Sequence, residues 1–377
     1  MYTIVEPYHR FDQKNNMVFR PLWDPSLRHI NPLNMETQLR NIERGIVGFE
    51  LKDFALAASA SVVATSLGTD INKANVGLTS WESLPVSMWF NFPERKPVLS
   101  DEAVMTDQIK RVARYFGADL VGIAKLDMRW VYSHHYIPET GESKPVEIDH
   151  RYQYVIVMAL EMDYDLFMTA PSAVHTAETR LVYSKMAFLV SSVAQLIRQF
   201  GYRAIPALND TALSVPIAVD AGLGELSRQG LLITPEFGPR QRLCKVITDL
   251  PLLPDDPVEL GVTQFCSVCG ECVRKCPAHA IFSGEPTAAV TSISSNSGVM
   301  KWPLNAEKCR EYWSKVGTNC GICIRVCPFN KGTGGIHNVS RWFIKHISYF
   351  DSWLVWMNRV LGYGKRLDSE LFWKGKI

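Results

Sequence analysis

The 377-residue sequence predicts an α+β protein with a smaller cysteine-rich module near its C-terminus. Three observations support this prediction. From Ser100 onward, segments with helical periodicity alternate with segments of strand periodicity. Eight of the nine cysteines lie between residues 266 and 328. The length and the apolar content of 47% are also enough for two units with a sizeable core.

Residues 1–100 are expected to form a cap region that is rich in aromatic side chains. This part is dense in Trp, Phe, Tyr and Pro and shows little regular periodicity. Its most apolar stretch, Phe54 to Leu67, is too short to span a bilayer and predicts a buried helix. No run of eighteen or more apolar residues occurs in the sequence, so no membrane-spanning segment is expected.

Residues 101–255 are expected to form the main domain, with strands and helices in separate layers. Ser100 or Asp101 can cap a first helix that stops at Gly117. Val, Ile and Tyr enrichment predicts strands, and an amphipathic pattern predicts a long helix that stops at Gly201. The predicted elements are a helix over Asp101 to Phe116, strands over Leu120 to Ala124, Tyr152 to Leu160 and Arg203 to Ala207, and a helix over Thr179 to Phe200.

Residues 256–345 are expected to form the cysteine-rich module, and residues 346–377 a C-terminal tail. Pro251, Pro254 and Pro257 mark the linker into the module. The tail carries many aromatic residues and is predicted to be helical over Ser348 to Leu361. We expect it to pack back onto the core, in preference to lying on a membrane surface.

The cysteines form two groups, each of which ends in a Cys-Pro pair. The first group has the C-x2-C-x2-C-x3-C-P spacing of bacterial ferredoxins, in which three thiolates bind one cluster and the fourth crosses to the other. The second group replaces its first ligand by a remote cysteine. The predicted ligands are Cys266, Cys269, Cys272 and Cys327 for one [4Fe-4S] cluster, and Cys276, Cys309, Cys320 and Cys323 for the second.

Structural zinc or disulfides would also use closely spaced cysteines. Zinc sites use two Cys pairs or mix Cys with His, and seldom add a third Cys two residues on. Disulfides suit small secreted scaffolds, whereas this chain can build a core without them. Two [4Fe-4S] clusters therefore fit the spacing best.

Charge and glycine content narrow the function further. Lys and Arg total 40 against 38 Asp and Glu, so no cationic field exists to hold a nucleic-acid backbone, and no nucleic-acid partner is expected. The segment from Ala221 to Arg242 is rich in glycine, but Ser227 stands where G-x-G-x-x-G needs its third glycine. A nicotinamide site is therefore unsupported. A loop around another large cofactor and ordinary tight turns both stay open.

Three stretches resemble the corrinoid-dependent reductive dehalogenases. They are RYFGADLVGIAKLDMRW (Arg114 to Trp130), GYRAIPALNDTAL (Gly201 to Leu213) and AGLGELSRQGLLITPEFGPRQRLC (Ala221 to Cys244). The cysteine pattern and the tail LGYGKRLDSELFW (Leu361 to Trp373) are also similar. The resemblance implies a nitroreductase-like domain that binds a cobalamin-type corrinoid base-off, followed by a ferredoxin-like module with two [4Fe-4S] clusters. No Asp-x-His-x-x-Gly motif occurs, which fits a family without a protein ligand below the cobalt.

The resemblance also implies roles for single residues. Tyr183 corresponds to the proton donor, Asn209 to the polar residue beside the substrate, and Arg242 to the arginine that supports the tyrosine. A phenol with an unperturbed pKa of about 10 is a poor acid at neutral pH, and a nearby guanidinium stabilises the phenolate. The expected corrinoid contacts are Thr179, Ala221, Gly222, Gly224, Gly230 and Gly238, and the expected aromatic substrate pocket is Phe11, Trp81, Trp89 and Trp302. The remaining cysteine, Cys244, is expected to be a small buried apolar residue.

The expected function is therefore the replacement of a halogen by hydrogen in a small halogenated organic compound. The resemblance to the family also implies a small membrane anchor protein and an electron donor from a quinone-linked chain. It further implies a peripheral position on the exoplasmic face of the cytoplasmic membrane. Such enzymes carry a twin-arginine export signal, which Met1 to Arg10 does not show, so we expect that it was removed. A homodimer is left open.

Two other functions compete with this one. Epoxyqueuosine reductase, a tRNA-modifying relative, shares the corrinoid and both clusters but uses an aspartate as proton donor. Asp210 beside Asn209 keeps it open, whereas the balanced charge and the Tyr183 and Arg242 pair favour the dehalogenase. An electron-transfer subunit would not need the large domain that precedes the cysteines.

Overall fold

A four-stranded antiparallel sheet lies at the centre of the fold, with the strand order β1-β4-β8-β5. The computed structural model describes residues 3–30, 34–67, 77–82, 101–331 and 334–377. The middle strands pair along their whole length, from Tyr154 opposite Thr248 to Glu161 opposite Gln241. The strands of this sheet are β1 (Leu120–Lys125), β4 (Tyr154–Glu161), β8 (Gln241–Thr248) and β5 (Ala204–Ala207).

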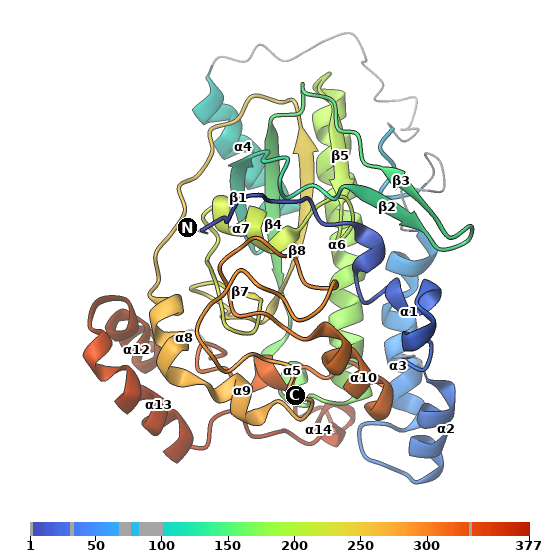
Figure 1. Cartoon of the computed structure of the whole chain (residues 1–377), viewed down its shortest axis with the longest axis vertical. Coiled ribbons are helices and arrows are strands. Elements are labelled where there is room, and N and C mark those ends of the chain that lie inside the picture. Colours follow the sequence, from blue (N-terminus) through green and yellow to red (C-terminus); the bar gives the residue numbers. More distant parts are fainter. Residues whose placement is uncertain (1–2, 31–33, 68–76, 83–100, 332–333) are drawn as a thin grey trace.

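Both faces of the sheet are covered. Because side chains alternate along a strand, β4 sends Ile156 and Met158 to one face and Val155 and Val157 to the other. The first face packs against α4 (Glu102–Tyr115) and α6 (Ala173–Gln199), and the second against α7 (Ser214–Asp220). Figure 1 shows the long α6 helix running beside the sheet. The predicted α+β architecture is confirmed.

The helices of the main domain begin and end largely where capping residues predict. The Asp101 carboxylate accepts a hydrogen bond from the Ala103 amide at the start of α4, and Gly117 follows its end with a φ of 107°. α6 begins at Ala173 rather than at Thr179, because the Ser172 hydroxyl caps it by accepting from the His175 amide at 3.1 Å. β8 is absent from the predicted strands, since three of its eight residues are polar or charged at its start and middle.

The described part of the N-terminal region consists of short helices joined by extended segments and turns, and it lies over one side of the core (Figure 1). The predicted buried helix becomes α3 and the π-helical turn η3, and only Asp53 and Ala57 of α3 are buried, so the expectation of burial is wrong for most of it. The elements are η1 (Gln13–Asn15), α1 (Arg20–Trp23), η2 (Pro25–Leu27), α2 (Met35–Glu43), α3 (Leu51–Ala60) and η3 (Val63–Leu67).

Two short hairpins and a series of helices complete the chain. The hairpins pair β2 (His134–Ile137) with β3 (Glu142–Pro145), and β6 (Glu225–Leu226) with β7 (Leu232–Ile233). Among the described residues, no helix is both long and apolar enough to cross a bilayer. The other helices are α5 (Tyr164–Met168), α8 (Val262–Cys269), α9 (Glu271–Lys275), α10 (Ala306–Val316), α11 (Ile322–Arg325), α12 (Gly335–His346), η5 (Ser348–Phe350), α13 (Asp351–Val360) and α14 (Glu370–Trp373).

Candidate active site

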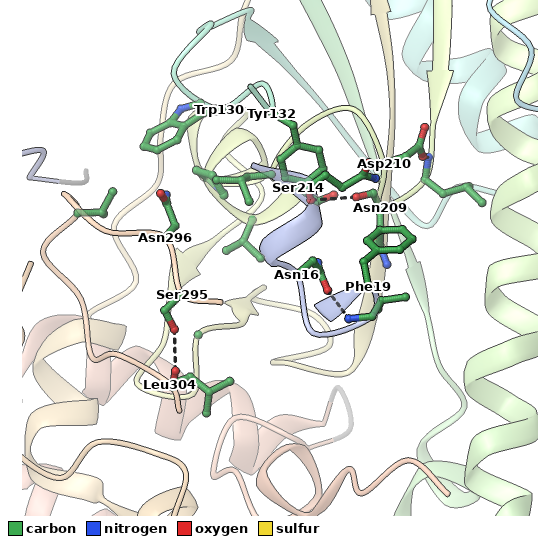
Figure 2. A pocket seen from close by; sticks show the side chains of 18 of the residues that line it. Asn16, Phe19, Trp130, Tyr132, Asn209, Asp210, Ser214, Ser295, Asn296 and Leu304 are labelled. Atoms are coloured by element: carbon green, nitrogen blue, oxygen red, sulfur yellow. Dashed lines mark hydrogen bonds between the residues drawn. The ribbon is translucent and has the colours of Figure 1, made fainter. Parts of the chain in front are cut away.

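A cavity of about 660 Å³ lies where several loops meet beside the sheet. Its wall combines aromatic rings with hydroxyl and amide side chains, which suits a ligand that is apolar in part. In Figure 2, Ser295, Asn296 and Leu304 lie on one side of this space, and Asn209 and Phe19 lie on the other. The lining includes residues of the N-terminal segment, the loop over residues 130–132, the α6 helix, the segment over residues 208–216 that leads into α7, the β6–β7 hairpin and the loop over residues 295–304.

The structure brings Tyr183, Asn209 and Arg242 together at this cavity. The Asn209 amide nitrogen donates a hydrogen bond to the Tyr183 hydroxyl. The Arg242 guanidinium carbon lies 5.4 Å from the centre of the Tyr183 ring, which places a cation against the aromatic face. Tyr183 and Asn209 line the cavity. The phenol is thus held between an amide donor and a positive charge.

Side chains alternate between the two faces of β8, which explains why Arg242 contacts a residue of α6. Arg242 lies on the same strand face as Cys244 and Val246, which belong to the core under α6. Its Nε atom is buried without a hydrogen-bond partner. An unpaired charged donor beside the phenol favours a negative charge at that point.

The loop that carries Asn209 is fixed by two buried side chains. Lys245, on the opposite face of β8 from Arg242, donates to the Leu208 carbonyl at 2.7 Å and to the Ser214 hydroxyl at 3.1 Å. Tyr132 donates to the Asn209 carbonyl at 3.1 Å. Burial lowers the pKa of Lys245 to about 8 and holds the pKa of Tyr132 well above its ordinary value. Lys245 and Tyr132 therefore hold the loop that carries Asn209 in place, and Tyr132 is itself part of the cavity wall.

Asp210 is tied into the same loop. Its carboxylate accepts a hydrogen bond from the Leu208 amide at 2.7 Å and from the Thr211 hydroxyl at 3.1 Å. These bonds use the carboxylate to shape the turn, in which Thr211 has a φ of 68°. The aspartate also lines the cavity, but its bonds are those of a turn residue.

The structure brings together the four cysteines assigned to the first cluster. Cys266, Cys269, Cys272 and Cys327 border one small void at the start of the module. Burial raises the pKa of Cys272 to about 12, so free thiols would stay protonated there and need a metal to ionise. Among the described residues, no three Cys, His, Asp or Glu side chains are placed to hold a single metal ion, whereas a cluster binds each thiolate through a different iron.

The cysteines assigned to the second cluster are also mutual neighbours. Burial, together with the nearby Cys320 and Cys276, raises the pKa of Cys309 to about 12. Cys323 has a pKa well above its ordinary value because it is buried and because Cys320 and Cys309 lie close to it. The remote Cys309, on α10, therefore reaches the other three across the module.

Comparison with known proteins places this geometry in a family. Residues 265–330 match the 4Fe-4S double cluster binding domain. The tetrachloroethene reductive dehalogenase of Sulfurospirillum multivorans is 36% identical over 379 aligned positions, which cover 91% of this chain and 76% of that protein. The chain belongs to the reductive dehalogenases. It is therefore an oxidoreductase whose cofactors are two [4Fe-4S] clusters and a corrinoid.

Further similarities agree with this assignment. The tetrachloroethene reductive dehalogenase of Dehalobacter restrictus is 36% identical over 304 positions, 70% of this chain and 55% of that protein. The catabolic reductive dehalogenase NpRdhA has the same fold, with a TM-score of 0.73 at 24% identity, over 97% of this chain and 48% of that one. This chain thus spans about three quarters of the first relative and about half of the other two.

Epoxyqueuosine reductase is a distant relation only. The enzyme of Lactococcus garvieae is 33% identical over 153 positions, which cover 39% of this chain and 40% of that protein. The similarity is confined to a part of the chain, whereas the dehalogenases match most of it. The similarity over most of the chain therefore supports a reductive dehalogenase, in preference to a tRNA-modifying enzyme or a simple electron carrier.

The residues around the cavity fit the corrinoid of a reductive dehalogenase. Gly230 lines the cavity with a φ of 76°, and a Cβ built there would meet no atom within 4 Å, so the backbone faces open space. Ser214, Ser295 and Asn296 offer polar groups for the amide-bearing edge of a macrocycle. Both amide atoms of Gln229, in the turn next to Gly230, are buried without a partner, but this side chain borders the void of the first cysteine set and not the cavity. They therefore indicate a missing partner on the cluster side of the turn.

One turn links the cavity to the first cysteine set. In the β6–β7 hairpin, Leu226 and Gly230 line the cavity while Arg228 borders the cluster void. The buried Arg228 side chain donates to the Cys266 carbonyl at 3.0 Å, and its guanidinium lies 4.5 Å from the centre of the Trp302 ring. This turn therefore connects the active-site cavity to the void bordered by the cysteines predicted for the first cluster.

The structure places only one of the described residues predicted for the aromatic pocket in the lining of the cavity. Trp302 lines the cavity. Phe11 and Trp81 pack on the neighbouring core instead, with the Phe11 ring 6.1 Å from that of Tyr132, and Trp89 lies outside the described residues. Phe19 and Tyr132 line the cavity although neither was predicted as a pocket residue. The only signal for them in the sequence is their place in aromatic segments.

Most of the other predicted corrinoid contacts have a packing role within the chain. A Cβ at Gly224 would lie 2.0 Å from the Ile233 carbonyl oxygen, and one at Gly238 2.2 Å from that of Phe329. Gly222, with a φ of 70°, likewise approaches the Asp256 carbonyl. Ala221 packs under β1, and the Thr179 hydroxyl donates to the Met162 sulfur at 3.7 Å. None of these five is a lining residue of the cavity, so their roles as cofactor contacts stay predictions.

Proposed function

We propose that this chain catalyses the reductive dehalogenation of a small organohalide. A carbon–halogen bond breaks and a carbon–hydrogen bond forms, which consumes two electrons and one proton and releases halide. The observation that carries this proposal is the Tyr183 hydroxyl in the cavity, bonded by Asn209 and placed against the Arg242 cation. When bound, the corrinoid supplies two-electron reduction at cobalt, and the clusters supply the electrons singly.

The three side chains divide the remaining work. Tyr183 gives its hydroxyl proton to the carbon that loses the halogen. Arg242 stabilises the phenolate that remains, because a positive charge on the ring face favours the anionic form. Asn209 fixes the hydroxyl orientation by donating to its oxygen, so the proton points away from the amide and into the cavity. The aromatic and aliphatic wall holds an apolar substrate and excludes water.

The substrate class is proposed from the relatives. Those from Sulfurospirillum and Dehalobacter are tetrachloroethene enzymes, and the partly apolar wall of the cavity suits a small chlorinated compound. We propose chlorinated ethenes as the first compounds to examine, with chlorinated alkanes and halogenated phenols beside them.

The cellular setting belongs to the same proposal. Family resemblance supports a small membrane anchor protein, a peripheral position on the exoplasmic face of the cytoplasmic membrane and electrons from a quinone-linked chain. We also propose domain limits at residues 100, 255 and 345, which follow from the sequence pattern, and a homodimer.

The test uses the purified holoprotein. Its absorbance should combine a corrinoid spectrum with the broad iron–sulfur band, and reduced viologen should drive chloride release from at least one compound of the panel. Absence of the corrinoid spectrum, or absence of halide release from every compound, would contradict the proposed function.

A further inference from the structure

One charged side chain in the wall of the active-site cavity has no part in the chemistry described above. Lys301 lines the cavity, and its ammonium donates a hydrogen bond to the Asn296 carbonyl. The backbone fixes this residue, because the Thr287 amide donates to the Lys301 carbonyl at 2.8 Å. The indole of the neighbouring Trp302 donates to the Gly284 carbonyl at 2.9 Å. Lys301 is therefore presented to the cavity by a loop that is tied down on both sides.

Among the described residues, this cation has no anionic partner. Burial lowers the pKa of Lys301 to about 8, and no acidic side chain offsets that effect. Asp210 is the only acidic residue among the described residues of the lining, and its carboxylate accepts hydrogen bonds from Leu208 and Thr211. The bond to the Asn296 carbonyl uses one of the three N–H donors of the ammonium. Charged groups that are partly removed from water are normally paired, so this part of the wall suits an anion.

The position of Lys301 separates it from the reacting groups. Figure 2 shows Asn296 on the side of the cavity opposite Asn209 and Asp210. The Lys301 ammonium lies at the Asn296 carbonyl, whereas the Tyr183 hydroxyl is bonded by Asn209. A halide that leaves the carbon beside Tyr183 therefore starts on the far side of the cavity from Lys301. An anionic group of the cofactor is the better partner for this lysine.

A complete corrinoid carries one such anion. The side chains around its ring are neutral amides, and one of them leads through an aminopropanol linker to a phosphodiester and a nucleoside. Lysine is a common phosphate ligand, because its ammonium is a compact charge with three rotatable donors. The uncharged Ser295 and Asn296 line the cavity near Lys301 and can contact the neutral amides. The phosphodiester is thus the group of the cofactor that matches the unpaired cation.

We propose that Lys301 binds the phosphodiester of the corrinoid, and that this ion pair makes the site select complete corrinoids over those that end before the phosphate. Lys301 is then a specificity-determining residue for the cofactor. The contact involves no covalent change. The inference rests on the corrinoid of the family and is independent of which organohalide the chain converts, so cofactor binding can be measured without any turnover.

The experiment compares three corrinoids that differ at the phosphate. Cobinamide ends before this group, cobinamide phosphate adds the phosphate alone, and cobalamin carries the phosphodiester with its nucleoside. The full chain with both clusters is prepared without corrinoid and without oxygen, and binding is measured by calorimetry and by absorbance. Lys301→Met removes the charge at similar length, and Lys301→Arg keeps the charge. Lys144→Met is the control, because this lysine is exposed in β3 and does not line the cavity.

We expect wild type, Lys301→Arg and Lys144→Met to bind cobinamide phosphate and cobalamin at least about tenfold more tightly than cobinamide, since a charge-assisted contact is gained. Lys301→Met should bind cobinamide as wild type does and lose this preference. Wild type without the preference, Lys301→Met that retains it, or Lys301→Met that no longer binds cobinamide would overturn the inference. If Lys301→Met retains the preference but loses inhibition by chloride, the lysine holds the released halide instead and the inference is wrong. Absence of halide release in wild type would count against the proposed function alone.

Discussion

Tyr183→Phe separates the chemistry of the active site from its stability. The substitution removes one hydroxyl and keeps the ring, so the contact with the Arg242 guanidinium at 5.4 Å is retained. The lost interaction is the hydrogen bond from Asn209, whose side chain is exposed and can bond to water instead. The structural cost is therefore that of one partly solvated hydrogen bond, about 0.5–1.5 kcal/mol.

The expected loss of rate is much larger than this structural cost. A positioned proton donor contributes about 10² to 10⁴ in rate, which corresponds to roughly 2.7–5.4 kcal/mol of activation free energy. We expect Tyr183→Phe to keep the corrinoid and both clusters, to unfold close to the wild-type temperature, and to lose at least a hundredfold in single-turnover halide release. A single-turnover measurement is needed because product release could otherwise hide a slower chemical step.

The control is Tyr115→Phe, which removes a hydroxyl from a residue that is 84% exposed and does not line the cavity. It should behave as wild type in both measurements. A Tyr183→Phe rate within about threefold of wild type, well short of the contribution of a proton donor, would remove Tyr183 from the mechanism. Water or another group would then have to supply the proton.

Three further outcomes follow from single contacts. Arg228→Met should lower the reduction potential of the first cluster, because it removes a buried cation beside Cys266; an unchanged potential in an EPR-monitored titration would contradict this. Gly224→Ala should cost about 1–3 kcal/mol in thermal unfolding, since its Cβ would lie 2.0 Å from a carbonyl oxygen, and a wild-type melting temperature would show that the hairpin can move. Burial lowers the pKa of Lys245 from 10.5 to about 8, so the unfolded state binds more protons between these values. Relative to Lys245→Met, wild-type stability should therefore rise by about 3 kcal/mol across this range in denaturant unfolding, and a flat difference would refute it.

The part of the fold that local signals encode was predictable. Caps and glycine stops identified α4, and the β-branched run identified β4. β8 was not predicted as a strand because Gln241, Arg242 and Lys245 interrupt its apolar pattern. These polar residues occur in a buried strand because each meets a partner from another part of the chain: Lys245 meets the Leu208 carbonyl, and Arg242 meets the Tyr183 ring. Local propensity carries no information about such contacts.

The active site was likewise predictable from the sequence only in part. Tyr183, Asn209 and Arg242 could be named from the family resemblance, and the structure brings them together. The aromatic wall could not be named as well, because any ring in an aromatic-rich segment is an equal candidate by composition. The path of the N-terminal segment decides that Phe19 faces the cavity and that Phe11 packs behind Tyr132.

By itself, the sequence determined the class of the protein. The spacing of eight cysteines specifies two iron–sulfur clusters, because ligands a few residues apart on one short segment must converge whatever the rest of the chain does. Only the tertiary structure decided what lies between and beside those clusters. The Arg228 turn, which joins the active-site cavity to the first cysteine set, arises where segments distant in sequence pack together. Such packing leaves no periodic trace along the chain.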